Sequence, residues 1–257
     1  MSTMSLKNKV AIVTGSSSGI GAAIAVKFSS EGAKIVLVGR NQTKLNAVAV
    51  KCSDPLVIRA ELANDDDVKR ILDETIQKFG KLDILVNNAG ISLCGSLFTG
   101  DLMRSLDELF KINFRAIVYL TKLAAPYLKQ TKGNIINISS ISGQRVSPIL
   151  GLMMYSSLKA ALDHFSKHAA LELSPHGVRL NVISPGPVKT DILKNTDKLE
   201  TTNTHHISWD EFASTTALHR VSEPEEIAEF AFFLVSEKAK GITGSVVVHD
   251  NGKFLKN

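Results

Sequence analysis

The fold of this chain is predicted by one stretch near its N-terminus, Val10-Ala11-Ile12-Val13-Thr14-Gly15-Ser16-Ser17-Ser18-Gly19-Ile20-Gly21. The apolar run at its start is typical of a buried strand, and a helical pattern follows over Ala22–Ser30. Between them, the glycines let the backbone pass close to a pyrophosphate, and the free N–H groups and dipole of the helix start attract an anion. Three residues separate the first two glycines, so the turn differs from the common G-x-G-x-x-G fingerprint. A plain strand-to-helix loop is the alternative, but the position after the first strand favours phosphate binding.

Outward from this stretch, short apolar runs alternate with helical patterns along the 257 residues. The predicted strands are Val10–Thr14, Lys34–Gly39, Leu56–Ile58, Leu82–Val86, Asn134–Ser139, Val178–Ile183 and Ser245–His249. The predicted helices are Ala22–Ser30, Asp65–Phe79, Leu102–Leu128, Met153–Leu173 and Pro224–Val235. Because the strands are almost continuously apolar, helices should cover both faces of a parallel sheet. We therefore expect one domain over residues 1–257, a Rossmann-type doubly wound α/β fold with a parallel β-sheet of about seven strands.

One region breaks the alternation, the polar segment Leu193–Val221, in which Trp209 and Phe212 lie on a short amphipathic pattern. A segment of this length is typical of a functional lid, so we predict a substrate lid at about 193–221. The pair His205-His206 within it has no Cys or carboxylate at a metal-binding spacing. We expect no metal site.

Composition narrows the classes of partner. Lys and Arg exceed Asp and Glu by five, but the charges are scattered, so we expect neither a nucleic-acid nor a membrane partner. Cys52 and Cys94 form no metal or disulfide pattern, as in a reducing compartment. No apolar stretch approaches the ~18 residues needed to span a bilayer. A cytoplasmic protein is the expectation.

The end of the second predicted strand bears on which dinucleotide binds. NAD sites place an acidic residue there, which grips the ribose 2′-hydroxyl, whereas here Gly39 is followed by Arg40. A guanidinium can pair with a 2′-phosphate, so the sequence favours NADP(H) over NAD(H). The alternative is that Arg40 only ends a strand at the surface.

Tyr155 and Lys159 stand four residues apart in a predicted helix. This spacing places them on one face, where the ammonium can favour the ionised phenol and lower its pKa. Such a phenol can act as a general acid or base. The alternative is an ordinary helical pair without chemistry.

Four motifs in this order make the chain resemble the short-chain dehydrogenase/reductase family, in its compact single-domain branch, over nearly its whole length. They are T-G-x-x-x-G-x-G at Thr14–Gly21, N-N-A-G at Asn87–Gly90, Y-x-x-x-K at Tyr155–Lys159, and a P-G segment at Pro185–Thr190. The resemblance implies the catalytic residues Asn113, Ser140, Tyr155 and Lys159. It implies a cofactor site made of Gly15, Ser17, Ser18, Gly19, Ile20, Gly21, Arg40, Glu61, Leu62, Asn88, Ala89, Gly90, Tyr155, Lys159, Pro185, Gly186, Val188 and Thr190.

The roles that the resemblance implies are chemically coherent. Tyr155 would supply the proton, Ser140 would hold the substrate oxygen, and Asn113 would anchor a water that replenishes the proton. Lys159 would lower the pKa of the phenol and bind the nicotinamide ribose. Thr190 would hold the carboxamide.

Three departures from the family pattern affect these implications. Glu61-Leu62 replaces the usual Asp at the adenine, and Asp250-Asn251-Gly252 replaces D-G-G. Fourteen residues separate Ser140 from Tyr155, about two more than usual, and Ser142 stands at the commoner distance. Ser140 is preferred because it ends the matching I-S-S segment, and the extra length in Gly143–Met154 should alter the pocket wall.

The expected function is that of an NADP(H)-dependent carbonyl reductase or alcohol dehydrogenase for a fairly apolar, steroid-, retinoid- or ketone-like molecule. A 3-oxoacyl-carrier reductase and a non-catalytic dinucleotide sensor or scaffold are the alternatives. Assembly into a homotetramer or homodimer is expected through the apolar faces of Leu102–Leu128 and Met153–Leu173. The apolar pocket residues should be Pro148, Ile149, Leu150, Leu152 and Met153, with Ile91, Leu93 and Leu97.

Overall fold

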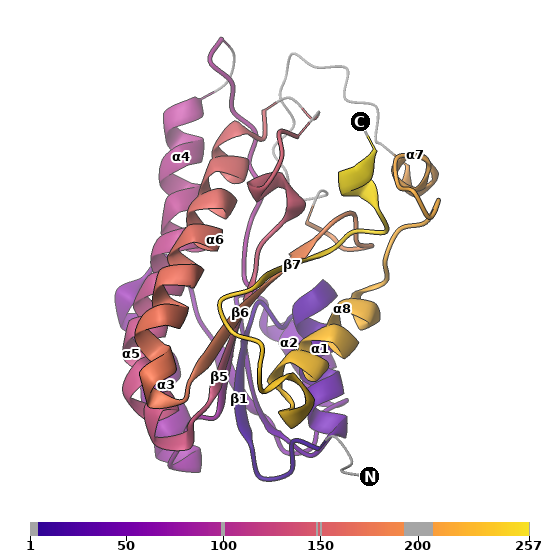
Figure 1. The fold of residues 1–257 in the computed structure, drawn as a ribbon. Coiled ribbons are helices and arrows are strands. Elements are labelled where there is room, and N and C mark those ends of the chain that lie inside the picture. The colour runs from indigo at the N-terminus through magenta and orange to yellow at the C-terminus, as the bar shows by residue number, and fades with distance from the viewer. Residues whose placement is uncertain (1–4, 99–100, 148, 150, 193–207, 257) are drawn as a thin grey trace.

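A computed structural model describes residues 5–98, 101–147, 149, 151–192 and 208–256. In this part of the chain, seven strands form one parallel sheet in the order β3-β2-β1-β4-β5-β6-β7 (Figure 1). The strands are β1 (Val10–Thr14), β2 (Lys34–Gly39), β3 (Leu56–Arg59), β4 (Ile84–Asn87), β5 (Asn134–Ile138), β6 (Arg179–Pro185) and β7 (Val246–His249). The strand order reverses direction between β1 and β4, which confirms the predicted doubly wound fold and places a ligand crevice at this point.

Two helical layers cover the sheet (Figure 1). One contains α1 (Gly19–Ser30), α2 (Gln42–Ala49) and α8 (Pro224–Val235), and the other contains α3 (Asp65–Phe79), α5 (Ala116–Thr131) and α6 (Met153–Leu173). Strand residues alternate between the two cores. Ala11 and Val13 pack under α1 and α8, whereas Ile12 packs under α3 and α5. Burial on both faces explains why the strands are continuously apolar in sequence.

The structure divides the helix predicted over Leu102–Leu128. It contains α4 (Leu102–Phe110), a π-helical turn at Lys111–Arg115 and then α5. The π-turn widens the helix at Asn113, a change that the apolar period does not reveal.

Two further helices flank the cleft described below. The sequence did not predict α2, which begins where the Asn41 side chain accepts a hydrogen bond from Lys44 N at 3.0 Å. The short helix expected around Trp209 and Phe212 is α7 (Trp209–Ser214), capped by Ser208 and Glu211. The rest of the predicted lid, residues 193–207, lies outside the described part of the chain. None of the described helices is both long enough and apolar enough to cross a bilayer.

Candidate active site

The carboxyl ends of the strands open into a cleft of about 660 Å³. It runs from the β1–α1 turn past the ends of β4 and β5 to the start of α6 and the C-terminal residues. Most of the predicted site residues line it: Gly15, Ser17, Ser18, Gly19, Ile20, Arg40, Glu61, Leu62, Asn88, Ala89, Gly90, Ser140, Tyr155, Lys159, Pro185, Gly186, Val188 and Thr190. Two predicted site residues, Gly21 and Asn113, do not line the cleft.

The glycine turn fits tightly against the loop after β4. A Cβ atom at Gly15, whose φ is +68°, would lie 2.8 Å from Ala89 Cα, and one at Gly21 would lie 2.4 Å from Asn88 Nδ2. Thr14 secures the same contact, because its Oγ1 accepts hydrogen bonds from the N–H groups of Asn88 at 3.0 Å and Ala89 at 3.1 Å. Gly21 therefore serves the packing of the turn. Gly15, Ser17, Ser18, Gly19 and Ile20 line the cleft at the N-terminus of α1, whose free N–H groups and dipole favour an anion.

Arg40 lies at the open edge of this half of the cleft. Its Nη1 is 3.7 Å from Glu61 Oε2, and the two side chains are 63% and 44% exposed. Ion pairs this exposed are weak, so the guanidinium is free to turn toward a phosphate. Across the same region, Lys44 Nζ lies 3.6 Å from Asp191 Oδ2, a contact that the sequence did not indicate.

Tyr155 is buried among Leu93, Leu109, Leu152 and Leu158. Burial raises the pKa of the Tyr155 phenol to about 12, and a hydrogen bond with the Ser140 hydroxyl partly opposes this. Both Ser140 and Ser142 line the cleft, but Ser140 is the one that meets the phenol. The hydroxyl of Ser140 also accepts a hydrogen bond from Ser142 N at 3.2 Å.

Lys159 lies one helical turn beyond Tyr155. Its Nζ donates to the Ile138 carbonyl at 2.9 Å and lies 5.6 Å from the centroid of the Tyr155 ring. Burial lowers the pKa of Lys159 to about 8, while the charge of Asp163 raises it. In the chain by itself, the burial of the phenol dominates its pKa and the Lys159 ammonium donates to a carbonyl, so the lowering of the Tyr155 pKa by Lys159 stays a prediction.

Asn113 lies fully buried behind the cleft, in the π-turn. Its Oδ1 accepts a hydrogen bond from Ile91 N at 2.9 Å, and its Nδ2 donates one to the Ile91 carbonyl at 2.8 Å. The side chain therefore joins the helix to the loop after β4. Its role in holding a water stays a prediction.

The cleft walls differ in part from the predicted pocket. Ile91, Ile149 and Leu152 line the cleft as expected, and Leu93 packs beneath Tyr155. Leu97 and Met153 are 69% and 41% exposed and do not line it, because their side chains point to the outer surface. Pro148 and Leu150 lie outside the described residues.

Besides Lys44, sequence reasoning missed two further cations in the lining, Arg145 and Lys253. Arg145 belongs to the lengthened Gly143–Met154 segment, and Lys253 follows the altered Asp250-Asn251-Gly252 motif. Both departures from the family pattern were visible in the sequence. The sequence did not show that the two segments lie side by side in the cleft. Within the described residues, no three His, Cys, Asp or Glu side chains are arranged to hold a metal ion, and His205 and His206 lie outside them.

Known proteins match this chain over most of its length. A family model described as enoyl-(acyl carrier protein) reductase matches residues 15–253. An uncharacterized oxidoreductase of Staphylococcus epidermidis is 40% identical over 205 residues, covering 77% of this chain and 88% of that protein. The 3-oxoacyl-[acyl-carrier-protein] reductase of Thermotoga maritima is 31% identical, covering 98% and 100%. The crystal structure of a short-chain dehydrogenase/reductase of unknown function from Caenorhabditis elegans, with cofactor, has a TM-score of 0.89 at 29% identity, covering 98% and 97%.

Proposed function

The chain belongs to the short-chain dehydrogenase/reductase family, and from this premise we propose that it uses NADP(H) to interconvert a carbonyl and a secondary alcohol on a fairly apolar small molecule. Membership makes it an oxidoreductase that acts on CH–OH groups. One observation carries the proposal: the buried Tyr155 phenol meets the Ser140 hydroxyl in the cleft that also contains the glycine turn and Lys159.

The residues of the cleft fit a dinucleotide. Gly15, Ser18 and Gly19 line the cleft at the start of α1, where no side chain caps the helix and its N–H groups can meet a pyrophosphate. Asn88, Ala89 and Gly90 would line the adenosine side, and Thr190 would hold the carboxamide. When bound, NADP(H) supplies or accepts the hydride.

The protein's own groups would handle the proton and the oxygen. Ser140 would hydrogen-bond the substrate oxygen, and Tyr155 would give its proton to that oxygen during reduction. Burial keeps the phenol protonated at neutral pH but makes it a weaker acid, so Lys159 would have to stabilise the phenolate that remains after proton transfer. Asn113 would hold the water that returns the proton.

The preference for NADP(H) rests on Arg40. Its guanidinium is largely exposed, weakly paired and part of the cleft lining, so it can form two parallel hydrogen bonds with a 2′-phosphate. The neighbouring Glu61 carboxylate could instead serve an NAD ribose. NAD(H) is therefore the alternative cofactor.

The substrate proposal rests on the walls of the cleft. Ile91, Ile149, Leu152 and Phe212 line it, which favours an apolar, steroid-, retinoid- or ketone-like body. The relative from Thermotoga maritima supports a second candidate, a 3-oxoacyl-carrier reductase. A carrier-bound ketone that turns over no faster than simple ketones would argue against this candidate.

The deciding experiment follows NADPH oxidation against a panel of carbonyls, with wild type beside Tyr155→Phe. Loss of the proton donor should lower kcat by about 10²–10⁴-fold, while NADPH affinity, measured by fluorescence titration, stays within about twofold. Equal rates in the two proteins would end the catalytic assignment and favour the sensor or scaffold.

The cytoplasmic location and the homotetramer or homodimer also stay proposals. Apolar side chains on α4 and α6 support assembly, since Met103, Phe110 and Leu171 are 61%, 41% and 74% exposed. Light scattering after size exclusion would give the subunit number, and a monomer would refute the assembly.

A further inference from the structure

The charged side chains that line the cleft fall into two groups. Near the glycine turn each cation has an acidic partner, Glu61 for Arg40 and Asp191 for Lys44. Beyond Lys159, the lining contains Arg145 and Lys253, and neither forms an ion pair with a described residue. Among the described residues, the positive charge at this end of the cleft is therefore not ion-paired with a carboxylate.

Arg145 is held in place by the C-terminal residues. Its half-buried guanidinium donates from Nη1 to the carbonyls of Lys253 and Lys256, both at 2.8 Å. It also lies 5.9 Å from the ring centroid of Phe254. A guanidinium has five N–H donors, so these contacts orient the group and leave other donors for a ligand.

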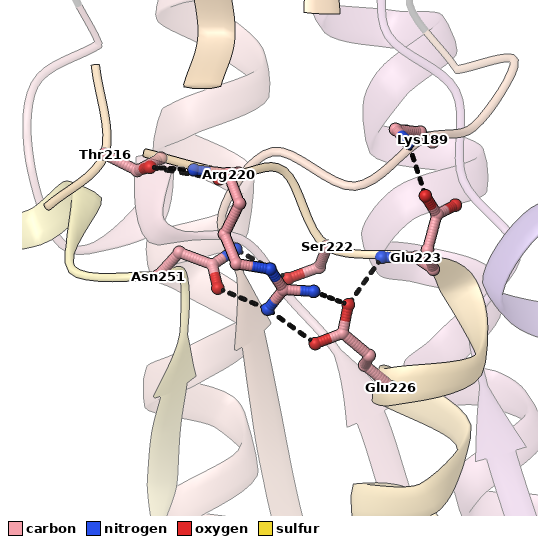
Figure 2. A network of polar contacts seen from close by, with 7 residues as sticks. All are labelled: Lys189, Thr216, Arg220, Ser222, Glu223, Glu226 and Asn251. Atoms are coloured by element: carbon pink, nitrogen blue, oxygen red, sulfur yellow. Dashed lines mark hydrogen bonds and ion pairs between the residues drawn. The ribbon is translucent and has the colours of Figure 1, made fainter. Parts of the chain in front are cut away.

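The C-terminal residues are anchored on their other side as well (Figure 2). Asn251, with a φ of +54°, accepts a hydrogen bond from Arg220 Nη1 and donates one to Ser222 Oγ, both at 2.9 Å. Arg220 is itself paired with Glu226. Asn tolerates the left-handed conformation, and unlike a glycine it supplies these two bonds. The change from D-G-G to Asp250-Asn251-Gly252 thus secures the residues that carry Lys253.

Lys253 is half-buried beside other cations. Burial and the charges of Arg145 and Lys256 all lower the pKa of its ammonium. Cations held together in this way repel each other, and an anion placed between them would relieve that repulsion. An ordinary surface lysine would instead extend into water with its head group free.

We infer that Arg145 and Lys253 form an anion-binding subsite of the substrate cleft, so that the preferred substrate carries a carboxylate or phosphate group remote from its carbonyl. The inference rests on the proposed function, because it describes the substrate of that same site. Apolar walls and a cationic end together select a molecule with an apolar body and an acidic terminus, such as an oxo or hydroxy acid or a ketone ended by a phosphate monoester.

The test compares matched substrates that differ only in charge. Straight-chain oxo acids with increasing separation between carboxylate and ketone are paired with their methyl esters, and a ketone phosphate monoester forms a second arm. Wild type should prefer at least one acid or phosphate to its neutral partner by about tenfold or more in kcat/KM. Lys253→Met should reduce this ratio by about tenfold, chiefly through KM, and Lys253→Arg should restore it.

Lys256→Met is the matched control. It removes the same charge from the same C-terminal segment, but Lys256 does not line the cleft and its Nζ donates to the Ser214 carbonyl at 3.2 Å. Its acid-to-ester ratio should equal that of wild type. Equal use of acids and esters by wild type, or an unchanged ratio in Lys253→Met, would overturn the subsite.

A binding measurement separates this inference from the proposed function. Thermal stabilisation of the NADPH complex by the acids, the esters and the phosphate monoester needs no turnover. Stabilisation by an anionic compound but not by its neutral partner, lost in Lys253→Met, supports the subsite even if no ketone is reduced. The same stabilisation in wild type and in Lys253→Met would overturn the subsite even if ketones are reduced.

Discussion

Asn113 and Ile91 exchange two hydrogen bonds: Ile91 N donates to Asn113 Oδ1 at 2.9 Å, and Asn113 Nδ2 donates to the Ile91 carbonyl at 2.8 Å. The exchange joins the π-turn to the loop that follows β4, whose residues Asn88, Ala89 and Gly90 line the cleft. A residue expected to act in proton transfer is therefore also a structural link beneath the proposed cofactor site.

Replacing Asn113 with Leu should destabilise the protein. Two backbone groups of Ile91 would lose their partners in a buried position, at a cost of about 1–3 kcal/mol in the free energy of unfolding. Urea denaturation measures this change. Asn46→Leu, at an exposed amide on α2, is the control and should stay within about 0.5 kcal/mol of wild type. A stable Asn113→Leu protein would show that the exchange is dispensable.

Ser140 and Ser142 should differ in catalysis. The Ser140 hydroxyl hydrogen-bonds the Tyr155 phenol, so Ser140→Ala should lower kcat by about 10²-fold if Ser140 holds the substrate oxygen as proposed. Ser142→Ala should stay within about threefold of wild type. Steady-state kinetics with one ketone and saturating NADPH compares the pair. The opposite ranking would assign the substrate oxygen to Ser142.

Arg40→Asp should shift the cofactor preference toward NADH. The substitution removes a cation that can pair with a 2′-phosphate and adds a carboxylate that repels it, so the KM for NADPH should rise by about tenfold or more. Glu61→Gln should act in the opposite sense and lower that KM, because it removes the anion 3.7 Å from Arg40. Initial rates with each cofactor give the ratio. If neither variant changes the ratio, Arg40 does not select the cofactor.

The stability of the protein should rise with pH above about 8 because of Lys159. Its pKa is about 8 when folded and 10.5 in the reference state, so between these values the unfolded chain binds more protons and unfolding becomes harder as pH rises. Tyr155, with its pKa raised from 10.0 to about 12, acts in the opposite sense only above pH 10.

Lys159→Met provides the reference for this pH dependence. The free energy of unfolding of wild type relative to Lys159→Met should increase by about 1–2 kcal/mol from pH 7.5 to pH 9.5. Urea denaturation at both pH values measures it. The same comparison is repeated with Asp163→Asn added to both proteins. This substitution removes the carboxyl that interacts with Lys159. A difference independent of pH would contradict the lowered pKa of Lys159.

Most of the fold could be predicted from local patterns. The strands β1 and β2 have the predicted bounds, because burial on both faces of a sheet demands unbroken apolar runs. The helices α3, α6 and α8 also have the predicted bounds. The π-turn at Asn113 could not be predicted, since it depends on a partner, Ile91, that lies 22 residues away. The helix α2 was also not predicted, because its apolar pattern is short.

The sequence by itself determined the class of chemistry, because the glycine turn, Arg40, Ser140 and the Tyr155/Lys159 spacing are local signals that need no distant partner. The tertiary structure decided the electrostatics and the substrate end of the cleft. Burial, which no motif records, sets the direction of the pKa shift of Tyr155. Arg145 and Lys253 are 108 residues apart, and only the folded chain brings these two cations to one end of the cleft, since the parallel sheet collects the carboxyl ends of its strands at one edge.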